Sequence, residues 1–317
     1  MEIRDWGLAC PVCLTPLLQE EEMRFVCPAD GRIYPRVDGV WRFLPPERAA
    51  YYAQFVQEYE TVRLAEGRQS DDPAYYRALP FRDLSGRMTA VWQERARTFG
   101  LLLKKVVEPL AAERERPLRI LDLGAGNGWL SYQLAKRGHE VTAVDLTVNP
   151  FDGLGIHAMY DAPFLPLQAE FTRLPLTGGQ ADLVIFNASF HYAESYEETL
   201  AEAQRAARAD GRIVIADSPV YRDPKNGRRM VREREAAFQA QYGFPSNALA
   251  SENFLWYDRL DKLAQTIGAT WTSYWSVSGW RRYIRYAKAR LRRQREPAQF
   301  PLIVFKNAQT GVSPFVL

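Results

Sequence analysis

The sequence is poor in cysteine and contains no long apolar run. Its three cysteines, Cys10, Cys13 and Cys27, are too few and too close together for a disulfide framework, so we expect a reducing, cytoplasmic environment. No apolar stretch approaches the ~20 residues that span a bilayer. Charged residues within the first five positions argue against a secretory signal peptide. The lack of cysteine beyond residue 27 also disfavours a cysteine nucleophile of the kind that attacks pyrimidine C5.

The chain also lacks a strong excess of one charge. Its formal net charge of +3 does not indicate a polyanion-binding protein by charge alone. The exception is the segment 281–295, which contains no acidic residue and interleaves Tyr283 and Tyr286 with basic residues. Such a helix could bind RNA phosphates, an anionic membrane or a phosphorylated small substrate, or could be a solvated helix face. Its basic residues are Arg281, Arg282, Arg285, Lys288, Arg290, Arg292, Arg293 and Arg295.

Changes in composition divide the chain into three parts. Residues 1–44 hold all the cysteines and several turn signals, which predicts a small β-rich module ending before Pro45. Residues 45–110 are dense in aromatic and charged side chains, with helices expected at 48–66 and 86–108 and loops at 70–73 and 79–80. We expect this part to be a helical lid or bridge. Residues 111–317 form the third part, the main domain.

From residue 118 onwards, apolar runs alternate with helical patterns. This succession predicts an α/β fold, a Rossmann-like and mostly parallel sheet with helices on both faces. The expected strands lie at 118–123, 140–144, 165–171, 181–187, 212–217, 269–276 and 301–306. The expected helices lie at 129–137, 196–209, 228–241 and 256–267.

The turn after the first of these strands is rich in glycine. Gly124, Gly126 and Gly128 have the spacing G-x-G-x-G, so the dinucleotide pattern G-x-G-x-x-G is not met. Asp122 precedes the first glycine, and an acid there suits a cationic amino group better than a pyrophosphate. Asp145 ends the next strand, where a carboxylate can accept hydrogen bonds from ribose hydroxyls. A nucleoside with an ammonium group and no phosphate describes S-adenosylmethionine.

These motifs resemble those of the class I S-adenosylmethionine-dependent methyltransferases. The resemblance covers roughly residues 115–220 and includes 121–128, Asp145, the segment 170–175 and the fourth-strand motif 182–189. Glu170 stands where the family pattern has Asp at an adenine contact. A Rossmann-like domain that binds another nucleotide is the alternative. The resemblance implies a cofactor site made by Asp122, Gly124, Ala125, Gly126, Asn127, Gly128, Asp145, Leu146, Glu170, Phe171 and Asn187.

The cysteines suggest a metal site in the N-terminal module. The segment resembles the small zinc-ribbon-like domain found as a methyltransferase activator and fused to some methyltransferases. This resemblance implies one structural zinc bound by Cys10, Cys13, Cys27 and Asp30, with Asp30 in place of a fourth Cys. The alternative is a metal-free module with ordinary core cysteines.

The reaction partners are less clearly marked. His191 follows the fourth strand and is our candidate catalytic base, which predicts a rate that rises through an apparent pKa near 6–7. No Asn/Asp-Pro-Pro-Tyr/Phe motif occurs at 187–190, which disfavours methylation of the adenine amino group. The segments 47–110 and 219–260 are expected to wall the acceptor pocket. Its candidate residues are Tyr75, Tyr76, Arg77, Tyr192 and Tyr221.

We therefore expect transfer of a methyl group from S-adenosylmethionine to a nucleophilic O, N or C of a small-molecule acceptor. The aromatic lid suits a small apolar cavity. The alternatives are methylation of an rRNA or tRNA base and a non-catalytic subunit that binds the cofactor or a partner.

Overall fold

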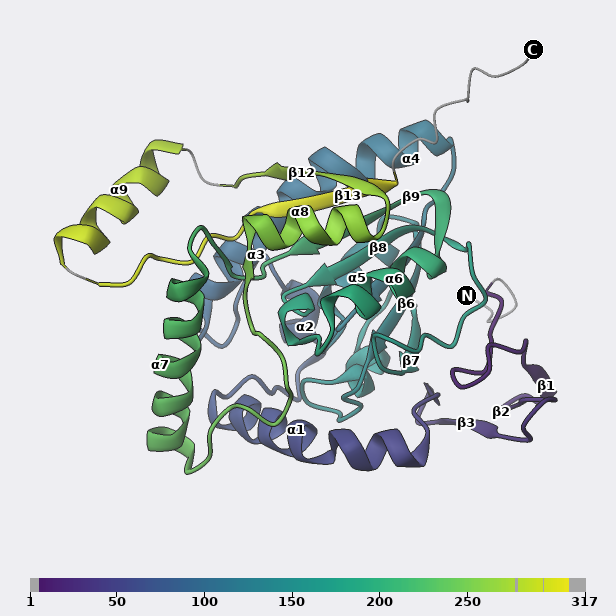
Figure 1. Cartoon of the computed structure of the whole chain (residues 1–317). Helices are drawn as coiled ribbons and strands as arrows, with labels where there is room; N and C mark the ends of the chain where they lie inside the picture. The colour runs from purple at the N-terminus through teal and green to yellow at the C-terminus, as the bar shows by residue number, and fades with distance from the viewer. Residues whose placement is uncertain (1–5, 277–278, 293, 308–317) are drawn as a thin grey trace, which may run out of the picture.

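The computed structural model describes residues 6–276, 279–292 and 294–307. Its centre is an 11-stranded sheet with the strand order β1-β2-β3-β4-β7-β6-β5-β8-β9-β13-β12. Helices cover both faces of this sheet (Figure 1). Of the basic segment 281–295, Arg293 and the side chains of Arg281, Arg282, Tyr283 and Arg285 lie outside the described part. None of the described helices is both long enough and apolar enough to cross a bilayer.

The central strands are parallel. They are β5 (Arg119–Leu123), β6 (Glu140–Asp145), β7 (Leu165–Gln168), β8 (Ala181–Asn187) and β9 (Ala207–Ala216). Strand β13 (Leu302–Asn307) runs antiparallel to both β9 and β12 (Ala269–Tyr274). The order reverses at β5, and in open α/β sheets such a reversal opens a crevice at the carboxyl ends of the strands. The predicted α/β fold is confirmed, but the whole sheet is mixed: its centre is parallel, whereas the strand pairs at both edges are antiparallel.

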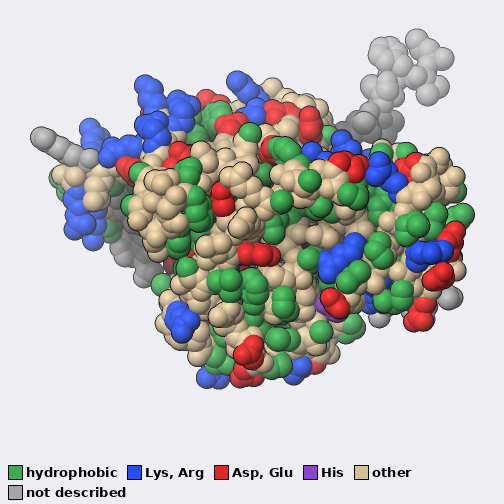
Figure 2. All heavy atoms as spheres, turned by 90° about the horizontal axis from the view of Figure 1, so that it is seen from below, with side chains coloured by type: hydrophobic (Ala, Val, Ile, Leu, Met, Phe, Trp, Pro, Cys, Tyr) green, Lys and Arg blue, Asp and Glu red, His purple; other side chains and the backbone are tan. Residues whose placement is uncertain are grey.

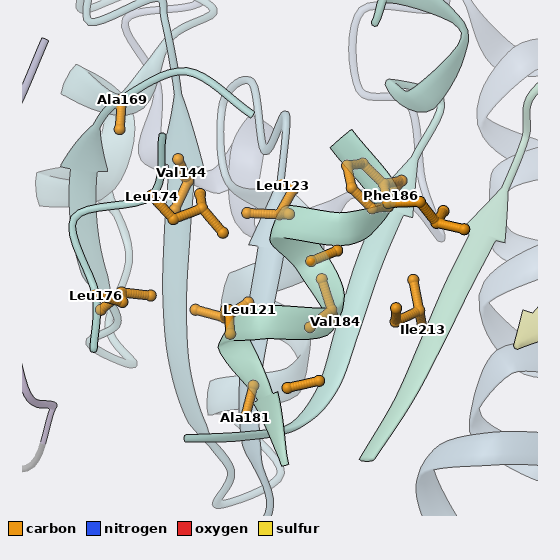
Figure 3. Close-up of a cluster of buried hydrophobic side chains, with 14 of the residues drawn as sticks. Leu121, Leu123, Val144, Ala169, Leu174, Leu176, Ala181, Val184, Phe186 and Ile213 are labelled. Carbon is orange, nitrogen blue, oxygen red and sulfur yellow. The ribbon is translucent and has the colours of Figure 1, made fainter. Parts of the chain in front are cut away.

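Successive side chains along each strand point to opposite faces of the sheet, so the hydrophobic core is divided into two clusters, one on each face. Leu121, Leu123 and Phe186 point into the cluster drawn in Figure 3, whereas Ile120 and Ile185 belong to the cluster on the opposite face. The first cluster is covered by α6 (Tyr196–Ala206) and α8 (Tyr257–Thr266). The second is covered by α3 (Thr89–Leu102), α4 (Glu108–Arg114) and α5 (Trp129–Ala135). Both faces are buried, which explains the nearly continuous apolar runs of β5 and β8.

The N-terminal module is β-rich and continues the main sheet. Its strands are β1 (Leu18–Glu21), β2 (Arg24–Val26), β3 (Ile33–Val37) and β4 (Val40–Arg42). Strand β4 pairs in parallel with β7, with Trp41 opposite Leu167. Trp41 and Phe43 belong to the same core as Leu121. The domain boundaries after residues 44 and 110 stay predictions.

The segment that links the module to the sheet is helical, as expected, and it contains a short helix where only loops were expected. It comprises α1 (Pro46–Ala65), α2 (Pro73–Ala78), α3, the π-helical turn η2 (Leu103–Val107) and α4. The sequence predicted only loops around α2. The loop at 70–73 instead supplies the start of a short helix, because Asp72 accepts a hydrogen bond from the Ala74 N–H at 2.8 Å and Pro73 fits the first turn.

The remaining elements follow β9 or connect the strands. They are η3 (Leu154–Met159), η4 (Phe190–Tyr192), β10 (Val220–Tyr221), α7 (Pro224–Tyr242), β11 (Leu255–Trp256) and α9 (Gly279–Leu291). Seen from the side on which α1 lies, basic, acidic and hydrophobic side chains are interspersed over most of the surface (Figure 2). This mixture agrees with the small net charge of the chain.

Candidate functional site

A cavity of about 160 Å³ lies where the carboxyl ends of β5, β6 and β8 meet. We call it the cofactor cavity. Its floor is made by the loops that follow these strands and β7, and its roof by one face of α1. The floor includes Gly124, Asp145, Leu146, Thr147, Glu170, Phe171, Thr172, Ala188 and Ser189. The roof consists of Arg48, Tyr52, Phe55 and Tyr59.

The glycine turn brings backbone directly to the floor. Gly124 has a φ of +76°, and its N–H donates to the Val144 carbonyl at 2.8 Å. A Cβ at this position would lie 2.3 Å from the Ser189 Cβ and 3.2 Å from the Phe171 ring. Only glycine meets both conditions without strain. The turn therefore leaves an open cradle that a side chain would fill.

Asp145 ends β6, and its carboxylate is held in one orientation. The Gly126 N–H donates to Oδ2 at 2.8 Å, and both the N–H and the hydroxyl of Thr147 donate to Oδ1 at 2.7 Å. A carboxylate offers about four acceptor sites, so roughly one remains for a ligand hydroxyl. Asp145 is half-buried and lines the cofactor cavity. A fixed and partly exposed acid at this position suits recognition of a ribose.

Asp122 lies beneath the turn, fully buried, and does not line the cavity. Its Oδ2 accepts a hydrogen bond from the Ser131 hydroxyl at 2.7 Å, whereas Oδ1 has no hydrogen-bond partner. Burial raises the pKa of Asp122 to about 7. Its contact with a cationic ligand group stays a prediction, although an unpartnered buried acceptor needs a donor.

The other predicted cofactor residues divide between the cavity wall and the turn beneath it. Leu146, Glu170 and Phe171 line the cofactor cavity. Asn127 instead braces the turn: its Nδ2 donates to Asp152 at 3.0 Å and its Oδ1 accepts from the Trp129 N–H at 3.2 Å. The remaining members lie in the turn or at the end of β8 and do not line the cavity; they are Ala125, Gly126, Gly128 and Asn187.

The roof was missed in the sequence. Arg48 Nε donates to Glu170 Oε1 at 2.9 Å, and the Tyr52 hydroxyl donates to Glu170 Oε2 at 2.8 Å. Glu170 is 2% exposed, and α1 supplies it with hydrogen bonds through Arg48 and Tyr52. Positions 48, 52, 55 and 59 recur at steps of four, three and four residues, which places them on one helical face. That spacing was the available signal.

His191, on η4, is buried and lines a second cavity of about 250 Å³ but not the cofactor cavity. Its Nδ1 lies 3.1 Å from the Ser218 hydroxyl. Burial, followed by the charges of Arg234 and Arg95, lowers the pKa of His191 to about 3. The imidazole is therefore neutral at physiological pH and a weak base. The expected inflection near pH 6–7 is not supported, and the catalytic role of His191 stays a prediction.

The second cavity adjoins the cofactor cavity and a third one of about 520 Å³, and all three share Ala188. Residues of α1 and of the segment 238–253 line the second cavity, within the segments expected to wall the acceptor pocket. Tyr192 lines both the cofactor cavity and the second cavity. We call the second cavity the acceptor cavity.

The other four predicted acceptor residues line none of these three cavities. Tyr75 and Tyr76 are core residues, and the Tyr76 hydroxyl donates to the Phe151 carbonyl at 2.6 Å. Arg77 is exposed and donates to the Met159 carbonyl at 2.8 Å. Tyr221 is buried on β10, where Arg295 Nη1 donates to its hydroxyl at 3.0 Å. The tyrosines at these positions therefore pack in the protein core and do not line an acceptor pocket.

The N-terminal module gathers the four predicted metal ligands. One ligand atom from each of Cys10, Cys13, Cys27 and Asp30 lies within 4.8 Å of the others. The Sγ atoms of Cys13 and Cys27 are 3.5 Å apart, and Cys10 Sγ is 3.5 Å from Asp30 Oδ2. Ligands about 2.3 Å from a tetrahedral zinc ion are separated by ~3.8 Å, so this donor set fits zinc.

Comparison with protein families gives two matches. Residues 121–215 match the family model of the methyltransferase domain, and residues 8–39 match that of the Trm112p-like protein. The first match contains the glycine turn, Asp145 and β8; the second contains the four clustered ligands. Both resemblances found in the sequence are confirmed for these residues.

Individual relatives are similar over part of the chain. The malonyl-[acyl-carrier protein] O-methyltransferase of Geobacter sulfurreducens is 32% identical over 36% of this chain and 44% of the relative. The demethylmenaquinone methyltransferase of Beutenbergia cavernae is 30% identical over 40% of this chain and 46% of the relative. The chain thus spans less than half the length of these relatives.

A solved structure aligns over most of the chain. It is the 1,6-didemethyltoxoflavin-N1-methyltransferase of Burkholderia thailandensis with bound 1,6-didemethyltoxoflavin and S-adenosylhomocysteine, at 16% identity. The alignment covers 92% of this chain and 99% of that chain with a TM-score of 0.47.

Proposed function

We propose that this chain, which contains a methyltransferase domain, transfers the methyl group of S-adenosylmethionine to a nucleophilic O, N or C of a small-molecule acceptor. The observation that carries the proposal is the cofactor cavity. It combines a side-chain-free glycine turn with the fixed carboxylate of Asp145, and it adjoins a separate acceptor cavity at Ala188. The small-molecule methyltransferases among the relatives support this class of acceptor.

The residues of the cofactor cavity fit a nucleoside with an amino-acid tail. Asp145 would bind a ribose hydroxyl, and the half-buried Leu146 and Phe171 would flank the adenine. The glycine turn would receive the amino-acid part, above the buried Asp122. When bound, S-adenosylmethionine supplies an electrophilic methyl group on a sulfonium. The absence of any phosphate-specific glycine spacing argues against a dinucleotide.

The described residues would accelerate methyl transfer mainly by holding the cofactor and the acceptor in the correct orientation. Phe55, Tyr59 and Tyr192 line both the cofactor and the acceptor cavities, so they would contact both reactants. Holding two reactants in the correct orientation supplies about 7–11 kcal/mol in favourable cases. The low pKa of His191 makes it a weak general base, so we assign it a positioning role towards the acceptor.

Calorimetry tests the cofactor assignment directly. We expect the full chain to bind S-adenosylmethionine and S-adenosylhomocysteine in the micromolar range, and to bind NAD and ATP much more weakly. Transfer of labelled methyl groups to a panel of small acceptors then tests turnover. Binding of NAD or ATP with equal affinity contradicts the proposal. Tight cofactor binding with no transfer to any acceptor favours the non-catalytic alternative.

We also propose one structural zinc ion in the N-terminal module, bound by Cys10, Cys13, Cys27 and Asp30. The clustering of the four ligand atoms supports it. Elemental analysis of protein purified without chelator should give about one zinc per chain. Cys13→Ser should lower both the zinc content and the thermal midpoint, because metal binding contributes to folding. A stably folded, zinc-free parent protein contradicts this proposal.

The remaining predictions concern partners and location. No RNA appears in the names of the relatives described above, and we propose none as acceptor. Arg295, in the basic segment, forms an intramolecular ion pair, since its Nε lies 2.7 Å from Glu233 Oε2. The cytoplasmic location expected from cysteine usage stays a prediction.

A further inference from the structure

The third cavity lies next to the end of β9 and is the largest of the three that meet at Ala188. Its volume of about 520 Å³ falls within the roughly 300–1,000 Å³ of small-molecule sites, whereas the acceptor cavity has only about 250 Å³. The third cavity and the acceptor cavity share Arg95 as well as Ala188. An acceptor larger than the acceptor cavity can therefore extend into the third cavity.

Asp217 directly follows β9 and lines the third cavity. The Ala188 N–H donates to the carbonyl of Ala216, the last residue of β9, at 2.9 Å, so Asp217 lies beside the residue that all three cavities share. The φ angles of Ala188 and Asp217 are +57° and +50°. This left-handed backbone is unfavourable for alanine, and strained positions of this kind cluster at ligand sites.

The carboxylate of Asp217 accepts one hydrogen bond, although a carboxylate offers about four acceptor sites. The hydroxyl of Thr98, which also lines the third cavity, donates to Oδ1 at 2.8 Å. Oδ2 is buried and has no hydrogen-bond partner among the described residues. A buried acceptor without a donor is costly, and the carboxylate can turn about its broad χ2 torsion to meet a ligand. The site therefore lacks a hydrogen-bond donor.

The charges around Asp217 favour a neutral donor over a cation. Arg95 acts on Asp217 through its charge, while its guanidinium lies 5.1 Å from the centre of the Trp92 ring. Glu94 also lines the third cavity, but its side chain is 60% exposed and pairs with Arg97. The positive charge of Arg95 thus offsets the negative charge of Asp217, and a cationic ligand would be repelled by Arg95.

Aromatic side chains contribute much of the remaining wall. Trp275, Tyr286 and Phe300 line the third cavity, together with Val91 and Pro297. Aromatic rings of this kind suit an aromatic body. An occupant that satisfies both parts of the cavity combines an aromatic ring with a hydrogen-bond donor.

We propose that the acceptor is a neutral aromatic compound whose N–H or O–H group donates a hydrogen bond to Asp217 while its ring lies in the third cavity. This inference rests on the proposed function and specifies its acceptor class. Asp217 does not line the cofactor cavity, so the donor is an anchoring group, separate from the atom that receives the methyl group. Anchoring at Asp217 directs the rest of the molecule towards Ala188, the residue shared with the cofactor cavity.

Pairs of compounds that differ by loss of the donor test the inference. Indole with N-methylindole, and phenol with anisole, are titrated by calorimetry into the full chain, both alone and saturated with S-adenosylhomocysteine. We expect at least one donor compound to bind about tenfold or more tightly than its methylated partner. Benzylamine, a cation, should bind no more tightly than benzyl alcohol.

Two variants separate recognition of the donor from recognition of the ring. Asp217→Asn tolerates the left-handed backbone and can still accept from Thr98, but its amide offers the ligand a donor, so the preference should disappear. Phe300→Ala removes a ring that is 45% exposed, so the fold should be retained. It should weaken binding of both members of each pair and keep the preference between them.

Glu94→Gln is the matched control, because it removes a negative charge from the same cavity at an exposed position. It should leave the preference unchanged. Thermal midpoints identify variants that fail to fold, and the measurement on the parent protein tests the inference without them. Equal binding within both pairs, or binding of neither pair, overturns the inference. So does a preference that survives Asp217→Asn, or a tenfold advantage of benzylamine over benzyl alcohol. Failure to bind S-adenosylhomocysteine while the donor preference persists overturns the proposed function alone.

Discussion

In the cofactor cavity, the floor is formed by loops at the ends of neighbouring strands, whereas the roof is formed by a helix that is distant in the sequence. The floor is local: the glycine turn directly follows β5, Asp145 is the last residue of β6, and Phe171 lies in the loop after β7, so their positions follow from the order of the sheet. The roof comes from α1, and Arg48 reaches Glu170 across 122 positions of sequence. A floor built at strand ends is fixed by the backbone, whereas the roof is fixed by a few side-chain contacts. Substitutions in the two regions should therefore differ in effect.

The largest effect on affinity is expected in the floor. Asp145→Ala removes the acceptor for the ribose and releases both Gly126 and Thr147 from their present positions. The one charge-assisted hydrogen bond that is lost contributes about 1.5–3 kcal/mol, and together with the disordering of the turn its loss should lower the affinity for S-adenosylhomocysteine about a hundredfold. Calorimetry measures this loss, and circular dichroism should show that the fold is retained. Asp71→Ala, at an exposed position, is the control. Unchanged affinity in the Asp145 variant would remove the cofactor assignment.

A substitution in the roof should affect stability more than affinity. Arg48→Met removes the closest ion-pair partner of the buried Glu170 carboxylate and leaves only Arg173, a partly exposed side chain whose Nε lies 3.8 Å from Oε1. Breaking a buried pair costs about 3–5 kcal/mol, and we expect the lower end because Arg48 is partly exposed. Denaturant unfolding measures this loss, while cofactor affinity should fall only about tenfold.

The double variant Arg48→Met/Glu170→Gln tests the cause of that loss. It removes the unpaired charge and should recover part of the stability. If Arg48→Met weakens cofactor binding more than Asp145→Ala does, the comparison between floor and roof is wrong.

The smallest effect on turnover is expected at His191. Its pKa of about 3 in the folded state lies below the ordinary value of 6.5, so the unfolded chain binds the proton first. Its contribution to stability is therefore complete above pH 6.5 and is lost as the pH falls towards 3. Between pH 7 and pH 5 the parent protein should lose about 2 kcal/mol that His191→Gln does not lose.

Activity gives the second measurement for His191. Turnover of the His191→Gln variant should stay within a few-fold of the parent, and the parent should show no inflection near pH 6–7. A hundredfold loss of turnover together with such an inflection would restore the role of general base.

The sequence allowed prediction wherever a pattern is local. The apolar runs gave the strands within a few residues, and the motifs gave the glycine turn, Asp145 and Phe171. The spacing of Cys10, Cys13, Cys27 and Asp30 along the chain predicted that they form one site, and the structure brings their ligand atoms together. These features depend on periodicity and on the carboxyl ends of parallel strands, both of which are readable along the chain.

The rest depends on tertiary contacts. Tyr75 and Tyr76 looked like cavity residues but pack in the core, because aromatic side chains serve both purposes equally well. Arg48 is one charged residue among many in its segment, and only the fold places it against Glu170.

The parallel pairing of β4 with β7 has a consequence for synthesis on the ribosome. Trp41 is synthesised 126 residues before Leu167 (167 − 41), the residue that pairs with it in the sheet. At about 5–20 residues per second, the β4 edge waits on the order of ten seconds for its partner. During that interval it offers unpaired backbone to neighbouring nascent chains. Strand β4 contains only three residues, and this shortness limits the danger. The module completes its folding only once the centre of the sheet has been translated.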